Sequence, residues 1–125
     1  MRVLRTVSLA VLAAVAGLAA TDAEKSLVGD WLMRPAAQGD PEAKGPGILV
    51  TFALEGDRLT GKAAQPQGHW PLTDIRYDGR ALSFRVHNGE EFLEARLKRV
   101  DEGFDGSYVG SETRQGGRLT LNRKK

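Results

Sequence analysis

The side chains suited to acid–base or metal chemistry are few in this sequence. Histidine occurs twice, at His69 and His87, and cysteine is absent. A zinc site needs three or four convergent His, Cys or carboxylate ligands, and no such spacing surrounds either histidine. We therefore expect no metal and no cofactor. The lack of cysteine also excludes a thiol nucleophile and disulfides.

Serine and aspartate give no clearer sign of catalysis. Ser83, Ser107 and Ser111 lack the glycine-flanked turn that presents a nucleophile in serine hydrolases. Asp74 is expected on the inner side of a strand, where a buried carboxylate needs a partner such as Arg76. Arg96 is a second candidate for that partner. We therefore name no catalytic residue, although an enzyme that uses Asp74 or a histidine remains an alternative.

Aromatic side chains offer the best candidates for a functional site. Six are expected to point inward: Trp31, Phe52, Trp70, Phe84, Phe104 and Tyr108. Apolar pockets with a few polar groups are the usual sites for small ligands. The candidate ligand-binding residues are Trp70, Phe84, Tyr108 and Phe52. The alternative is that all of these rings simply fill a core.

Strands are needed to position these rings, and the sequence predicts them. Apolar residues recur at every second position over 48–54, 82–86, 93–97 and 119–121. Asp-Gly and Asn-Gly pairs, which favour tight hairpins, separate several of these runs. We expect eight strands, at 26–34, 47–55, 58–64, 69–76, 80–87, 91–99, 103–110 and 117–123. The chain is thus predicted to be all-β, a single antiparallel up-and-down β-barrel, since closure removes exposed strand edges.

One connection is too long for a hairpin turn. The segment from Pro35 to Gly47 holds three of the five prolines and no large apolar residue. We expect a surface loop between the first two strands. Such a loop is either a lid over a binding site or a simple connection.

The pattern Gly29-Asp30-Trp31 in the first strand resembles the Gly-x-Trp of lipocalins and the wider calycin superfamily. The resemblance implies that an arginine of the last strand packs across the tryptophan at the barrel floor. Here Arg123 has the matching position, so Gly29, Trp31 and Arg123 are the expected floor. The chain lacks the C-terminal helix of lipocalins and is more similar to small lipocalin-like domains of bacterial secreted proteins. This likeness implies a fold more than a function.

The N-terminal segment has the composition of a secretory signal. Arg2 and Arg5 precede an uncharged run of small and apolar residues that extends to Ala20. We expect a signal at 1–23 and a barrel domain at 24–125, with cleavage after Ala23 or, as the alternative, after Ala20. The mature protein is then periplasmic or secreted. A retained membrane anchor is less well supported, because a spanning helix needs about 20 apolar residues.

The distribution of charge limits the classes of partner that this protein is expected to bind. Beyond the expected signal the basic and acidic residues nearly balance and are interleaved along the chain. A nucleic-acid-binding protein should instead carry a basic face, so we expect no nucleic acid partner. The leading hypothesis is a non-enzymatic exported barrel that binds a small apolar or amphipathic ligand. The alternatives are a solid-core module that binds an unknown protein or envelope partner, and an enzyme.

Overall fold

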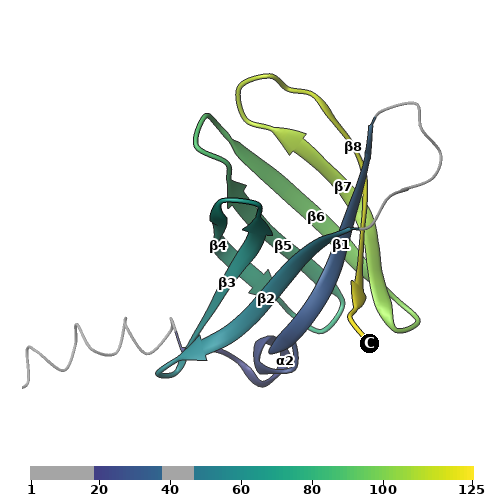
Figure 1. Ribbon diagram of the computed structural model, residues 1–125. Coiled ribbons are helices and arrows are strands. Elements are labelled where there is room, and N and C mark those ends of the chain that lie inside the picture. Colours follow the sequence, from purple (N-terminus) through teal and green to yellow (C-terminus); the bar gives the residue numbers. More distant parts are fainter. Residues whose placement is uncertain (1–18, 38–46) are drawn as a thin grey trace, which may run out of the picture.

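The computed structural model describes residues 19–37 and 47–125, and it shows a closed barrel of eight antiparallel strands (Figure 1). The strands are β1 (Gly29–Ala37), β2 (Ile48–Glu55), β3 (Arg58–Gln65), β4 (Gly68–Tyr77), β5 (Ala81–His87), β6 (Phe92–Val100), β7 (Gly103–Gly110) and β8 (Gly116–Arg123). Each pairs with its neighbours in sequence, and β8 closes onto β1. The prediction of a single up-and-down barrel is confirmed.

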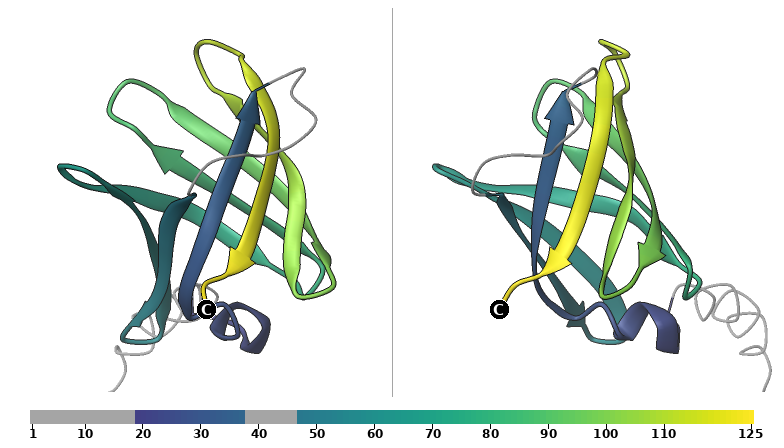
Figure 2. Two further views of the ribbon diagram at one scale, coloured as in Figure 1. Left: turned by 45° about the vertical axis from the view of Figure 1, so that its right-hand side comes forward. Right: turned by 90° about the vertical axis from the view of Figure 1, so that its right-hand side faces the viewer.

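A short helix, α2 (Asp22–Lys25), precedes the first strand, which therefore begins later than expected. The Thr21 side chain accepts a hydrogen bond from the N–H of Glu24, and the Glu24 carboxylate accepts one from the N–H of Thr21. This reciprocal cap satisfies backbone donors that the first turn leaves unpaired. Figure 2 shows α2 at the end of the barrel where β8 ends. In the described residues no helix is long and apolar enough to cross a membrane.

Strand β1 also ends later than predicted, because it continues through Pro35 to Ala37. Pro35 lies opposite Leu119 of β8, whereas pairing with β2 stops at Met33. Among the described residues that side of β1 has no ladder beyond Met33, which is a position that tolerates a proline without an N–H. The rest of the expected loop, 38–46, and the expected signal up to residue 18 lie outside the described residues.

The expectation that Asp74 points inward is wrong. Strand β4 contains a bulge, since the pairing with β5 shifts register between Thr73 and Arg76. Asp74 has a φ of 53° and is exposed. The additional residue in the bulge reverses the alternation, so that Tyr77 is buried instead. Asp74 pairs with Arg85 at 3.4 Å, not with Arg76 or Arg96.

Packed aromatic rings fill the barrel next to α2. Phe104 lies between Trp31 and Tyr77, with ring centroids 5.5 and 5.3 Å away. Phe52 and Phe84 form an edge-to-face pair at 6.2 Å deeper in the core, and both are 1% exposed. The Tyr77–Phe104 and Phe52–Phe84 pairs have the favoured edge-to-face geometry, and the Trp31–Phe104 pair is tilted at 53°. The rings make this part of the barrel interior a filled core.

The floor of the barrel joins the two ends of the described fold. The guanidinium carbon of Arg123 lies 4.1 Å from the centroid of the Trp31 ring. Arg123 also donates hydrogen bonds to the carbonyls of Val28 and Ser26, each at 3.1 Å. Trp31 donates from Nε1 to the carbonyl of Leu27 at 2.8 Å. A Cβ at Gly29 would lie only 2.8 Å from Arg123 Nη1, so a glycine keeps room for the guanidinium.

Replacing Trp31 with alanine tests this floor. Trp31→Ala should lower the free energy of unfolding by about 3–5 kcal/mol, because it empties a packed aromatic site. Leu54→Ala is the control, since Leu54 is an apolar residue that is 40% exposed, and it should cost under about 1 kcal/mol. Urea unfolding followed by circular dichroism measures both. Equal losses in the two variants would contradict a packed floor at Trp31.

The helix cap makes a prediction about the mature N-terminus. If the first residues are a secretory signal, cleavage after Ala23 removes Thr21 and half of the cap, and it removes Ala23 itself from its packing against the core. Cleavage after Ala20 keeps both. We therefore expect a mature chain that begins at Thr21, and an intact mass of the exported protein measures it. A chain that begins at Glu24 would show that the cap is dispensable.

Candidate functional site

A narrow cavity lies inside the barrel at the end opposite α2, which we call the mouth. Its volume is about 40 Å³, room for no more than a few water molecules. The lining is apolar: Met33, Pro35, Ile48, Trp70, Val86, Leu93, Ala95, Tyr108 and Leu119. Trp70 and Tyr108 are half-buried here, so two of the four predicted ligand-binding residues meet at the mouth.

The other two predicted residues lie elsewhere. Phe52 and Phe84 do not line the mouth cavity and pack on each other in the core. The four aromatic residues therefore do not form one pocket. The alternation of residues along a strand identifies which side chains point inward. It does not give their position along the barrel axis.

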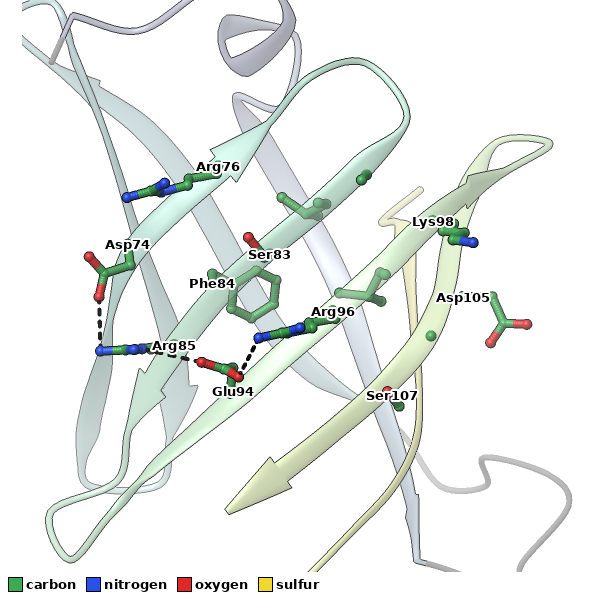
Figure 3. A pocket seen from close by; sticks show the side chains of 14 residues that line it. Asp74, Arg76, Ser83, Phe84, Arg85, Glu94, Arg96, Lys98, Asp105 and Ser107 are labelled. Atoms are coloured by element: carbon green, nitrogen blue, oxygen red, sulfur yellow. Dashed lines mark hydrogen bonds and ion pairs between the residues drawn. The ribbon is translucent and has the colours of Figure 1, made fainter. Parts of the chain in front are cut away.

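A larger hollow lies on the outer face of the barrel, over β4 to β7. This outer groove has a volume of about 750 Å³, and Figure 3 shows its side chains. Most of its lining side chains point outward: Asp74, Arg76, Ala81, Ser83, Arg85, Glu94, Arg96, Lys98, Asp105 and Ser107. Leu82, Phe84, Leu97 and Gly106 contribute to its floor.

Small residues and the β4 bulge explain why this face is hollow. Ala81, Ser83 and Ser107 leave space between longer side chains. A Cβ at Gly106 would collide with the carbonyl oxygen of Arg96, so glycine allows β7 to lie this close to β6. The bulge lies between Thr73 and Arg76, and a bulge bends its strand. The side chains of Asp74 and Arg76 are exposed there.

A chain of ion pairs crosses the groove. Arg85 lies 3.4 Å from Asp74 and 3.6 Å from Glu94, and Glu94 lies 3.0 Å from Arg96 (Figure 3). The Arg85 guanidinium also lies 4.4 Å from the Phe92 ring centroid. Individual surface pairs contribute little stability, about 0–1 kcal/mol. In the structure these contacts link the side chains of Arg85 and Arg96 to Asp74 and Glu94.

The groove retains uncompensated positive charge. Asp105 accepts two hydrogen bonds from Arg118, at 3.0 and 2.8 Å, which lower the pKa of Asp105. Among the described residues neither Arg76 nor Lys98 has a carboxylate partner. Both side chains are exposed at the groove. The site can therefore accept an anionic group.

The histidines do not join either hollow. His69 is exposed at the start of β4, and His87 Nε2 lies 2.7 Å from Thr73 Oγ1. The His87 ring also packs near Phe92, with centroids 5.8 Å apart. Within residues 19–37 and 47–125 there is no cluster of three side chains that is suited to a metal ion.

The groove was not predicted from the sequence. From the sequence we considered Ser83 and Ser107 only as nucleophiles, a role for which we found no support, and Arg96 only as a partner for Asp74. Their outward direction follows from the alternation in β5, β6 and β7, which is visible in the sequence. The missing information was the cross-strand register, which decides which outward residues are neighbours.

Comparisons with known proteins add no functional assignment. No protein-family model, no curated protein and no solved structure matches this chain.

Three carboxyl groups with lowered pKa values make the free energy of unfolding depend on pH. Backbone N–H groups of Ala81 and Arg80 lower the pKa of Asp78, those of Glu112 and Thr113 lower the pKa of Glu91, and Arg118 lowers that of Asp105. A carboxyl group with a lowered pKa in the folded state stabilises that state above the unfolded-state pKa. This stabilisation is lost as the pH falls through the lower, folded-state value.

We therefore expect the free energy of unfolding to decline as the pH falls below about 4. Asp105→Asn should lower stability at pH 7 and make the decline shallower. Asp57→Asn, in the exposed turn after β2, is the control. Urea unfolding at a series of pH values measures the slopes. Identical slopes in the wild type and Asp105→Asn would show that the Arg118 pair does not perturb Asp105.

Proposed function

We propose that this protein is a non-enzymatic binding module that uses the outer groove of β4 to β7 as its working surface. The observation that carries the proposal is the contrast between the two hollows. The groove offers about 750 Å³, whereas the interior cavity offers about 40 Å³. Sites for small molecules usually measure about 300–1,000 Å³. The barrel interior then serves as a packed scaffold.

The charge arrangement supports the same proposal. Arg85 and Arg96 are fixed by Asp74 and Glu94, so binding costs them less conformational entropy than it costs a free arginine. Arg76 is exposed beside them, and no carboxylate of the described residues pairs with it. A prearranged set of charges favours a specific polar partner over general adhesion.

A second candidate function uses the mouth. Its lining is wholly apolar apart from the tyrosine hydroxyl, and Trp70 and Tyr108 lie half-buried at it. A small apolar or amphipathic ligand is the chemistry that fits such a lining. The ligand must displace side chains, because the cavity itself is too small for it.

The proposal also includes the cellular location of the protein and the type of barrel to which it is similar. The basic start and apolar run of the N-terminal segment support export to the periplasm or the medium. The Gly29, Trp31 and Arg123 contacts support a likeness to lipocalin-type barrels. In this proposal the barrel has no large ligand chamber and binds on its outside.

Labelling at a single cysteine tests the working surface, because the chain has no cysteine of its own. Ser107→Cys places an environment-sensitive fluorophore in the groove, and Ala53→Cys places it on the exposed face of β2. Envelope extract from the producing cells should change the emission at position 107 alone. Equal responses at both positions would contradict a localised working surface.

Native mass spectrometry on the protein purified from its own cells distinguishes binding at the mouth from binding in the groove. We expect the mass of the bare chain, also after laurate is added. A stoichiometric laurate adduct that is lost in Trp70→Ala would place function at the mouth. Ser107→Ala is the matched control, since it alters the groove and leaves the mouth lining intact.

A further inference from the structure

Arginine and serine alternate in register across five strands of the outer face. Arg76 of β4 lies opposite Ser83 of β5, which lies opposite Arg96 of β6. Arg96 in turn lies opposite Ser107 of β7, and Ser107 lies opposite Arg118 of β8. Directly opposed residues in antiparallel strands point to the same face. Figure 3 shows the first four following one another across the groove.

The spacing in this row is set by the sheet. Neighbouring strands lie about 4.8 Å apart, so arginines on alternate strands are about 10 Å apart at their backbones. The serines between them are too small to fill the gap and leave hydroxyl groups at the floor. Arg96 is held by Glu94 but its side chain is 75% exposed. The row therefore presents guanidinium groups at a regular interval with hydrogen-bonding groups between them.

Carboxylates border the same row. Asp74 and Glu94 lie in the groove lining beside Arg85, with side chains that are 55% and 28% exposed. A purely anionic chain would be repelled by them. Ligand hydroxyl groups would instead donate hydrogen bonds to these carboxylates, which accept several each. The lining thus suits a ligand that carries both acidic groups and hydroxyl groups.

We propose that the groove binds an acidic polysaccharide whose uronate carboxylates pair with Arg76 and Arg96. This inference rests on the proposed function of the groove. In an extended, ribbon-like sugar chain successive rings face opposite ways, so carboxylates on one edge recur at every second ring. That interval is close to the separation of Arg76 and Arg96 across two strand spacings. Ser83 then contacts ring hydroxyls between the two acidic groups, and Ser107 contacts those on the far side of Arg96.

Two other polymers fit the groove less well. An extended peptide gains most from pairing with a free strand edge, and the closed barrel has none among its eight strands. Single-stranded nucleic acid gains from stacking on exposed aromatic rings. Among the described residues that line the groove, the one aromatic ring is that of Phe84, which is 1% exposed.

The test is titration of the full-length mature protein with β-1,4-linked oligomannuronate by isothermal calorimetry. A β-1,4-mannan oligomer of the same length has the same backbone without carboxylates and serves as the ligand control. The variant is Arg76→Gln with Arg96→Gln, and the matched control is Arg58→Gln with Lys62→Gln on exposed β3 positions. Circular dichroism establishes that each variant is folded.

We expect oligomannuronate to bind and the mannan not to bind. The groove variant should weaken binding by at least about tenfold, since charge-assisted hydrogen bonds are lost, and the β3 variant by less than about twofold. Added salt should weaken binding of the wild type more than binding of the groove variant.

The outcomes separate this inference from the proposed function. Poly-glutamate or single-stranded DNA that binds more tightly than oligomannuronate, and is weakened by the groove variant, would overturn the polysaccharide and keep the groove as the working surface. Binding of all three polymers that is equally weakened by the β3 variant would overturn both. Equal binding of mannan and oligomannuronate would overturn the pairing of uronate with arginine.

Discussion

The closure of β8 onto β1 is the constraint on which the rest of the structure depends. It removes both edges of the sheet, and it joins parts of the chain that lie more than ninety residues apart. Arg123 secures this seam because it stacks on Trp31 and binds the carbonyls of Ser26 and Val28. The same guanidinium therefore joins the last strand, the first strand and the segment that covers the floor.

Closure with only eight strands also limits the space inside the barrel. A barrel of this size is just wide enough for side chains to fill it. Phe52, Phe84 and Phe104 are buried in the interior together with the aliphatic core, and a cavity of about 40 Å³ remains at the mouth. The outer face, by contrast, presents charged side chains at the fixed spacing of the strands.

The alternation of apolar residues and the Asp-Gly and Asn-Gly turns were sufficient to predict the barrel, because both signals are local. The errors were also local and have physical causes. A helix cap at Thr21 shortened β1 at its start, and pairing with β8 carried it past Pro35. The bulge at Asp74 reversed the inward and outward alternation of β4. A strict period of two does not predict such a reversal. The depth of Phe52 and Phe84 depends on barrel tilt, which no single strand encodes.

The groove was hidden for a different reason, because it is a property of register and not of any one segment. The overall charge is nearly balanced, and from that balance we predicted only that the protein has no nucleic-acid partner. The cross-strand register shows that positive and negative side chains are paired at some places on the outer face and not at others. Asp74, Glu94 and Asp105 are paired with arginines, whereas no carboxylate of the described residues pairs with Arg76. A near-neutral protein can therefore present a local row of cationic side chains on one face, and the proposed anionic ligand requires such a row.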